Sequence, residues 1–186
     1  MRKITSLYPQ DMDSFLDIGC CRGAYVIEAS QRPRCRTAVG IDVHEPFVST
    51  ASLVKEHLGI HNAHFHLATL EDLTNDPAAY GGPFHTVLLI GTYHYLFWGS
   101  VIDQGCYLNH EKILSMVSRT CTPSVIMSAR FEVKDCPQTI KQKAKELGDK
   151  VIYNTEHFVE KAEELFEVRK VGHLGRYPIF LMLRRN

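Results

Sequence analysis

At residues 14–25 the chain reads Ser14-Phe15-Leu16-Asp17-Ile18-Gly19-Cys20-Cys21-Arg22-Gly23-Ala24-Tyr25, and this stretch decides the fold. Its first residues are mostly apolar and suit a β-strand, whereas the residues after Gly23 suit a helix. Gly19 and Gly23 permit a tight turn that a ligand can approach closely, because neither carries a side chain. The backbone N–H groups at the start of the helix would point toward such a ligand. The stretch therefore predicts a strand, turn and helix that bind a nucleotide.

The glycine spacing separates two classes of nucleotide-binding protein. The dinucleotide fingerprint is G-x-G-x-x-G, but the positions two and five after Gly19 are Cys21 and Ala24 here. The pattern Asp17-x-Gly19-x-x-x-Gly23 instead resembles motif I of class I S-adenosylmethionine-dependent methyltransferases, which usually carries a glycine where Cys21 stands. The resemblance implies that this turn, including Gly19, Cys21 and Gly23, contacts the amino-acid part of the methyl donor. It also implies that Asp17 orients the loop or the donor's ammonium group.

A second apolar run, residues 37–43, ends with Asp42 and Val43. A carboxylate at the end of the second strand of such a unit accepts hydrogen bonds from ribose hydroxyls, in NAD and in S-adenosylmethionine alike. Asp42 is alternatively a cap for the next helix, whose first turn would contain Pro46. With the glycine turn upstream we favour the ribose role, and we place Val43 beside it in the cofactor site.

The third strand is expected at residues 63–68 and is followed by Thr69-Leu70-Glu71-Asp72. In the methyltransferase family an acid after this strand commonly holds the adenine amino group, and the next residue packs on the ring. Thr69 stands at the position of the acid, and Leu70 stands beside it. Glu71 or Asp72 substitutes for the acid, or the backbone and Leu70 hold the adenine alone; a solvated helix start is the competing interpretation of both acids.

A dense apolar strand at residues 84–90 is followed by Gly91-Thr92-Tyr93-His94-Tyr95-Leu96-Phe97-Trp98. Ligands bind at the carboxyl edge of open α/β sheets, which is where this segment falls. It resembles motif IV of the methyltransferase branch in which a glycine is followed by a histidine. We expect Gly91 at the cofactor and His94 as the catalytic base, since its ordinary pKa lies near physiological pH. Tyr93 and Tyr95 are placed on the substrate side, although aromatic clusters more often form core.

Arg130 and Glu132 follow the fifth strand, expected at residues 124–129, and are substrate-side candidates by position alone. The segment 131–150 exceeds the minimal fold, and we interpret it as a possible insertion on the substrate side. It contains a lysine-bearing helix, for which a solvated surface helix is the simpler interpretation.

The chain closes with two apolar runs, residues 166–174 and 177–184, which must pair antiparallel because a parallel return needs a longer crossover. Class I methyltransferases end in such a hairpin, so the resemblance extends from Phe15 to Arg185. It implies an α/β fold with a doubly wound, seven-stranded, mostly parallel sheet and helices on both faces. The expected strand order is 3-2-1-4-5-7-6 with the last strand antiparallel, in a single domain over 1–186.

The composition narrows the partners. The chain has 186 residues, 45% of them hydrophobic, and its 21 Lys and Arg balance 21 Asp and Glu, so no global field recruits nucleic acid. A small-molecule acceptor is therefore preferred, with tRNA or another RNA as the alternative. No signal peptide or membrane span is recognisable, which favours a cytoplasmic protein without a membrane partner. The six cysteines show no C-x-x-C pair and are expected as reduced thiols, without a metal site.

The resemblance implies an S-adenosylmethionine-dependent methyltransferase that releases S-adenosylhomocysteine and has an unidentified acceptor. Two further hypotheses stay open. One is an NAD(P)-dependent oxidoreductase using the same turn and ribose acid. The other is a catalytically inactive binding module, suggested by Cys21 and Thr69 at positions where the family usually has glycine and an acid.

Overall fold

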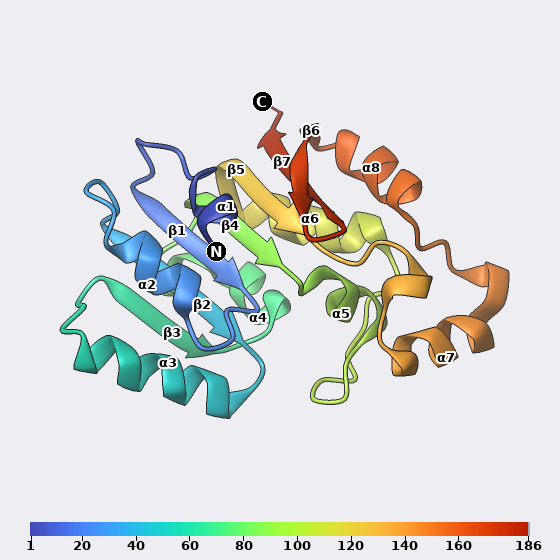
Figure 1. Cartoon of the computed structure of the whole chain (residues 1–186), viewed down its shortest axis with the longest axis horizontal. Helices are drawn as coiled ribbons and strands as arrows, with labels where there is room; N and C mark the ends of the chain where they lie inside the picture. Colours follow the sequence, from blue (N-terminus) through green and yellow to red (C-terminus); the bar gives the residue numbers. More distant parts are fainter. Residues whose placement is uncertain (186) are drawn as a thin grey trace.

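The computed structural model describes residues 1–185. Seven strands form one sheet in the order β3-β2-β1-β4-β5-β7-β6, which confirms the predicted order (Figure 1). Strands β1 to β5 are parallel where they pair, and β7 runs antiparallel to both β5 and β6. The strand bounds are Ser14–Ile18 (β1), Thr37–Asp42 (β2), Ala63–Leu67 (β3), Phe84–Ile90 (β4), Cys121–Ser128 (β5), Phe166–Leu174 (β6) and Tyr177–Arg184 (β7).

Side chains of the central strands are buried on both sides of the sheet. In β1, Phe15 belongs to one hydrophobic core and its neighbour Leu16 to the other, because successive side chains of a strand point to opposite faces. In β4, Leu88 lies in the first of these cores, whereas Val87 and Leu89 lie in the second. A strand covered on both faces has no polar side, which explains why the sequence of β4 shows no alternation.

Helices form one layer on each face of the sheet (Figure 1). One face carries α1, α2 and α3, and the other carries α4, α6 and α8. Two more helices, α5 and α7, lie beyond the carboxyl ends of the parallel strands. The helix bounds are Arg2–Thr5 (α1), Ala24–Ser30 (α2), Glu45–His57 (α3), Leu70–Asn75 (α4), Tyr93–Trp98 (α5), His110–Thr120 (α6), Gln138–Leu147 (α7) and Thr155–Glu163 (α8).

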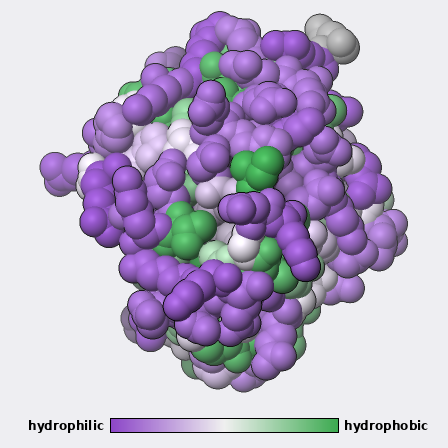
Figure 2. Space-filling view, turned by 90° about the vertical axis from the view of Figure 1, so that its right-hand side faces the viewer, coloured by the Kyte–Doolittle hydropathy of each residue, from purple (hydrophilic) through white to green (hydrophobic). Residues whose placement is uncertain are grey.

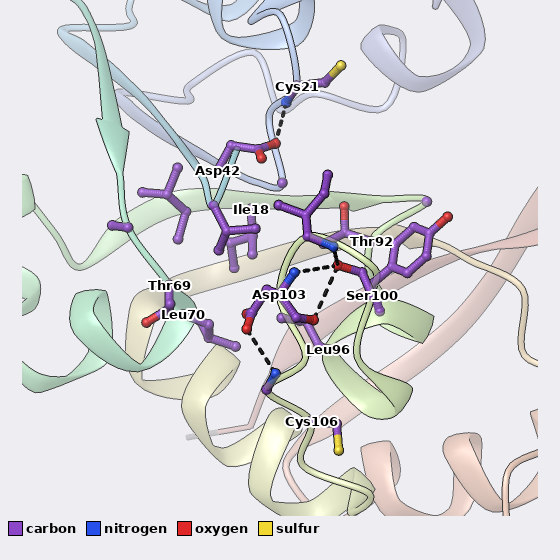
Figure 3. Close-up of a pocket in the computed structure, with 18 of the residues that line it drawn as sticks. Ile18, Cys21, Asp42, Thr69, Leu70, Thr92, Leu96, Ser100, Asp103 and Cys106 are labelled. Carbon is purple, nitrogen blue, oxygen red and sulfur yellow. Dashed lines mark hydrogen bonds between the residues drawn. The ribbon is translucent and has the colours of Figure 1, made fainter. Parts of the chain in front are cut away.

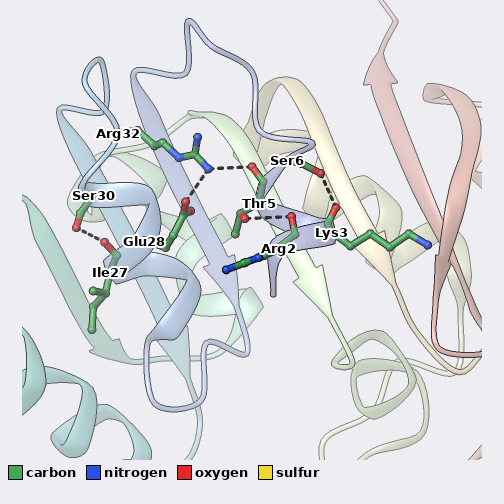
Figure 4. A network of polar contacts seen from close by, with 8 residues as sticks. All are labelled: Arg2, Lys3, Thr5, Ser6, Ile27, Glu28, Ser30 and Arg32. Carbon is green, nitrogen blue, oxygen red and sulfur yellow. Dashed lines mark hydrogen bonds and ion pairs between the residues drawn. The ribbon is translucent and has the colours of Figure 1, made fainter.

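The N-terminal segment is fastened to α2 by one arginine (Figure 4). Arg32 Nη2 donates to the Thr5 carbonyl at 3.0 Å and to Glu28 Oε1 at 2.6 Å. The same guanidinium lies over the ring of Tyr8, with its carbon 5.6 Å from the ring centre. Because Tyr8 is buried in the core on this face, the first residues of the chain cover the sheet there.

The face of the molecule seen in Figure 2 is mostly hydrophilic, with small separate hydrophobic areas. It is the face toward which α7 and α8 lie in Figure 1. Among residues 1–185, no helix combines the length and apolar character needed to cross a bilayer.

Candidate functional site

A cavity of about 770 Å³ opens at the carboxyl edge of the parallel strands. Its lining comes from the ends of β1, β2, β3 and β4, from α5 and from the loop at residues 99–108 that follows it (Figure 3). β1 and β4 are neighbours in the sheet although they are far apart in the chain. The cavity therefore lies at the switch point of the strand order, where open α/β sheets bind ligands.

The turn after β1 is held by the neighbouring strand. The N–H groups of Gly19 and Cys20 donate to the Ile41 carbonyl at 2.8 and 3.0 Å. Gly19 has a φ of +77°, and a Cβ there would overlap the side chain of Thr92, so only glycine fits. Gly19 and Cys21 both line the cavity. The sequence pattern suggested that backbone N–H groups of this turn face a ligand, but in the structure the first ones have internal acceptors.

Asp42 joins two turns at the floor of the cavity (Figure 3). Its Oδ2 accepts a hydrogen bond from the Cys21 N–H and its Oδ1 accepts one from the His44 N–H, both at 2.9 Å. The bond to His44 satisfies backbone at the start of α3, as the capping interpretation of Asp42 required. A carboxylate accepts about four hydrogen bonds, so both oxygens keep capacity for a ligand. Val43, the next residue, also lines the cavity.

Thr69 and Leu70 reach the cavity from the end of β3 and the start of α4. Thr69 caps α4: its hydroxyl accepts from the Asp72 N–H at 3.1 Å, and Asp72 Oδ2 accepts from the Thr69 N–H at 2.9 Å. These hydrogen bonds with Thr69 lower the pKa of Asp72. Of the two acids considered as substitutes for the family's adenine ligand, Asp72 serves the cap, whereas Glu71 lines the cavity.

Two members of the predicted glycine motif lie outside the cavity lining. Asp17 is 2% exposed, and its burial, together with the nearby Asp42 carboxylate, raises its pKa to about 8. Gly23 has a φ of +81°, and a Cβ there would overlap the Phe65 ring and Ala51. The glycine at this position is therefore explained by close packing of α2 against its neighbours.

The aromatic segment in α5 behaves differently from its sequence-based prediction. Tyr93 is fully buried, and its hydroxyl bonds His110 Nδ1 at 2.6 Å, so its placement on the substrate side is wrong. Phe97 and Trp98 are likewise core residues. Tyr95 is 37% exposed and lines the cavity, as does Gly91 at the end of β4. A single turn of helix divides its residues between core and solvent, and strand-like counting cannot assign them.

His94 is fully buried and does not line the cavity. Burial, followed by the charge of Arg130, lowers its pKa to about 3. A general base must reach the proton that it removes, so this position corrects the prediction that His94 is the catalytic base.

Arg130 and Glu132 also lie outside the lining. Arg130 Nη1 contacts His94 Nε2 at 2.7 Å. Glu132 Oε1 accepts from the N–H and the hydroxyl of Thr155, at 3.1 and 2.7 Å. The Glu132 carboxylate thus holds the start of α8, which corrects its placement on the substrate side.

The sequence analysis missed the loop at residues 99–108, which forms one wall of the cavity (Figure 3). Ser100 Oγ accepts from the Asp103 N–H at 2.9 Å, and Asp103 Oδ1 accepts from the Gly105 N–H at 2.9 Å. Ser-x-x-Asp-x-Gly is a turn-forming pattern that was present in the sequence as a signal. Lys143 Nζ donates to the Trp98 carbonyl at 2.6 Å and fastens α7 to the start of this loop. Pro137 and Thr139, from the predicted insertion, complete the lining.

Comparison with curated proteins gives one short match. Over 50 residues the chain is 36% identical to a tRNA (guanine-N(7)-)-methyltransferase of Trichormus variabilis, which is 27% of this chain and 23% of that protein. The aligned part is thus less than a quarter of that relative.

Solved structures with the same fold include three methyltransferase-related proteins. Monomeric WbdD has a TM-score of 0.64 and 20% identity; 91% of this chain is covered but only 35% of the WbdD chain. The N-terminal domain of EvdMO1 with bound S-adenosylhomocysteine gives 0.67 and 16%, covering 99% and 79%. Magnesium protoporphyrin IX methyltransferase from Synechocystis PCC 6803, with bound S-adenosylmethionine, gives 0.59 and 17%, covering 99% and 76%.

The family model described as "Methyltransferase domain" matches residues 9–173, from before β1 into β6. The match includes every strand that contributes to the cavity and nearly the whole sheet. By this match, the chain belongs to the methyltransferase-domain family.

Proposed function

We propose that this protein is an S-adenosylmethionine-dependent methyltransferase with a small-molecule acceptor. The observation that carries the proposal is the charge of the cavity. Its lining contains three carboxylates, those of Asp42, Glu71 and Asp103, and one ammonium group, that of Lys112. S-adenosylmethionine carries a sulfonium and an ammonium, and a cavity with an excess of carboxylates suits such a cation.

The residues present fit the donor in other respects as well. Asp42 has free acceptor capacity toward ribose hydroxyls, and Glu71 is the acid nearest to the expected adenine position. Ile18, Ile41 and Leu70 give the cavity an apolar wall for the adenosine. Gly91 has a φ of +73° and open space where a Cβ would stand, which leaves room beside the methyl group.

S-adenosylmethionine supplies a methyl group bonded to positively charged sulfur. The acceptor nucleophile bonds to the methyl carbon while the carbon–sulfur bond breaks, and the electron pair of that bond stays on sulfur in S-adenosylhomocysteine. A proton on the nucleophile, if one is present, leaves to solvent or to a base on the acceptor. The chain's own contribution is alignment and exclusion of water, for which Tyr95, Leu96 and the loop at residues 99–108 are placed at the cavity.

An RNA acceptor is the second candidate, because the one curated relative is named as a tRNA methyltransferase. The sequence offered the lysines of α7 as a phosphate-binding patch. In the structure Lys143 is bonded to the Trp98 carbonyl and to Cys106 Sγ at 3.1 Å, so this lysine does not face solvent phosphate freely. The balance of 21 positive and 21 negative side chains also favours a small acceptor. We further propose a cytoplasmic location, supported by the six free cysteines.

Calorimetry with S-adenosylhomocysteine tests the donor site. We expect binding to the unmodified protein and a loss of about 1 to 3 kcal/mol in Asp42→Ala, the scale of hydrogen bonds to a charged acceptor. Asp149→Ala is the matched control, because Asp149 is exposed and outside the cavity lining. Equal affinities of Asp42→Ala and the unmodified protein would remove Asp42 from the site.

Thermal shifts separate the remaining hypotheses, since any ligand of the native state raises the melting temperature. Stabilisation by NAD(H) or NADP(H) and not by S-adenosylhomocysteine would support an oxidoreductase. Donor binding without methyl transfer to any metabolite or tRNA pool would support an inactive module.

A further inference from the structure

One guanidinium beside the cavity has no acidic partner. Arg130 follows β5 and is half-buried, and none of the ion pairs within residues 1–185 involves it. Its Nε donates to the Tyr177 hydroxyl at 3.4 Å, and its guanidinium carbon lies 5.6 Å from the centre of that ring. Half-buried charges usually have a partner of opposite sign. Arg130 therefore keeps unused capacity to bind an anion.

His94 fixes the direction of this guanidinium. Arginine always donates, so the 2.7 Å contact between Arg130 Nη1 and His94 Nε2 requires that Nε2 accept the hydrogen bond. The proton of the neutral imidazole is then on Nδ1, a buried atom without a hydrogen-bond partner in the described part of the chain. His94 is also packed against Tyr95, with the ring centres 4.2 Å apart. These contacts hold Arg130 next to the residue that lines the cavity.

The neighbouring arginine provides a contrast. Arg176 also lies over the Tyr177 ring, but its Nη2 is 3.2 Å from Asp135 Oδ1. Its charge is therefore already balanced, and its side chain is 68% exposed. Of the two guanidinium groups on Tyr177, only that of Arg130 combines partial burial with an unbalanced charge.

The two sides of the carboxyl edge thus carry opposite charge. Asp42 and Glu71 follow β2 and β3, whereas Arg130 follows β5, on the far side of β4. Gly91 joins the two sides, because it lines the cavity and its N–H donates to the Ser128 carbonyl of β5 at 2.7 Å. A cationic donor on the acidic side leaves the β4–β5 side for the acceptor.

We propose that Arg130, oriented by His94, binds an anionic group of the methyl acceptor, either a carboxylate or a phosphate. This inference rests on the proposed methyl transfer, because it assigns the opposite side of the same edge to the acceptor. Arg130 acts as a specificity-determining residue, and His94 acts as a positioning residue through it. The side chain of Tyr95 lies between the guanidinium and the cavity and orients the apolar part of the acceptor.

Small aromatic probes test the subsite in the protein saturated with S-adenosylhomocysteine. Benzoate and phenyl phosphate represent the two anion types, and benzamide is a neutral analogue of benzoate; binding is followed by ligand-observed NMR. We expect at least one anion to bind about tenfold more tightly than benzamide, as a charge-assisted hydrogen bond provides. Arg130→Gln removes this preference, whereas Arg169→Gln on β6, an exposed arginine paired with Glu167, keeps it. Equal binding of anions and benzamide, or a preference that survives in Arg130→Gln, overturns the proposal.

Two variants of His94 test its positioning role. His94→Leu fills the volume without an acceptor and is expected to lose most of the anion preference. His94→Gln keeps an acceptor oxygen and is expected to retain more of it. A purely structural role would lower melting temperature in both variants without this difference in anion binding.

Donor affinity, measured on the same variants, separates this proposal from the previous one. Because Arg130 and His94 do not line the cavity, S-adenosylhomocysteine affinity should be unchanged in both. Donor binding without an anion preference overturns only the subsite. Absent donor binding in the unmodified protein overturns the proposed function, and the anion titration is then repeated without donor to decide the Arg130 subsite by itself.

Discussion

The two sides of the carboxyl edge differ in where their polar groups find partners. On the β2–β3 side the partners are mostly local: Asp42 bonds the N–H two residues on, and Thr69 bonds Asp72 three residues on. On the β4–β5 side they are distant, because Tyr93, His94 and Arg130 bond groups 17, 36 and 47 residues away. Local partners make a site legible in sequence, whereas distant partners depend on how the helices pack.

The largest expected effect tests whether glycines in the turn are needed for packing. Gly23→Ala should lower the free energy of unfolding by about 3 kcal/mol, from positive-φ strain and overlap with the Phe65 ring. Gly59→Ala is the matched control, with a φ of +65° and no atom near its Cβ, and should cost about 1 kcal/mol. Urea denaturation measures both. Equal losses would show that backbone strain alone requires glycine at Gly23.

The acidic side should become less stable as pH rises. Asp17 has a folded pKa of about 8 against 3.8 for its ordinary value, so between these values the folded state holds a proton that the unfolded state loses. The stability contribution is complete below about pH 4 and is lost toward pH 8. Asp17→Asn should therefore gain about 2 to 3 kcal/mol over the unmodified protein between pH 5 and 8, on the scale of 1.4 kcal/mol per pKa unit. A constant difference across this range would contradict the raised pKa.

The β4–β5 side should respond in the opposite direction. Burial, followed by the charge of His157, lowers the pKa of His110 to about 3 from 6.5, so the unfolded state binds a proton that the folded state does not. Stability is complete above about pH 6.5 and is lost as pH falls toward 3. His110→Gln should reduce the acid loss between pH 6.5 and 4.5 by about 2 kcal/mol. Chemical denaturation at several pH values measures it, and an unchanged acid loss argues against His110.

A tyrosine pair sharpens the distinction between core and cavity. Tyr93→Phe removes a buried hydroxyl bonded to His110 and should cost about 1 to 1.5 kcal/mol of unfolding free energy. Tyr95→Phe changes an exposed side chain and should leave stability within about 0.5 kcal/mol of the original. Thermal unfolding of both variants gives the comparison. The reverse order would return Tyr93 to the cavity.

The smallest expected effect concerns the residue that departs from the family pattern. Cys21 has a φ of +50°, a conformation that costs a side-chain-bearing residue about 1 kcal/mol. Cys21→Gly should therefore raise unfolding free energy by up to about 1 kcal/mol, reduced by the greater entropy of glycine in the unfolded chain. Donor affinity measured on the same variant decides the inactive-module hypothesis. A marked gain in affinity would mean that Cys21 obstructs the donor.

The strand order and the acidic side of the edge were predictable from the sequence. Period and glycine spacing are local properties, and Asp42, Thr69 and Leu70 each follow a strand directly, so their arrival at one edge follows from the parallel topology. The family resemblance supplied the strand order, which local residues alone do not specify.

The β4–β5 side was decided by tertiary structure. Whether Tyr93, His94 and Tyr95 face core or cavity depends on the rotation of the single short helix α5, and that rotation is set by its packing against α6 and the buried residues around it. Arg130 likewise acquires its neighbours only when the closing hairpin brings Tyr177 beside β5. The sequence by itself determined where each strand ends. Long-range packing decided which side chains at those ends meet a ligand, because burial and hydrogen bonding between distant segments fix the orientation of each one.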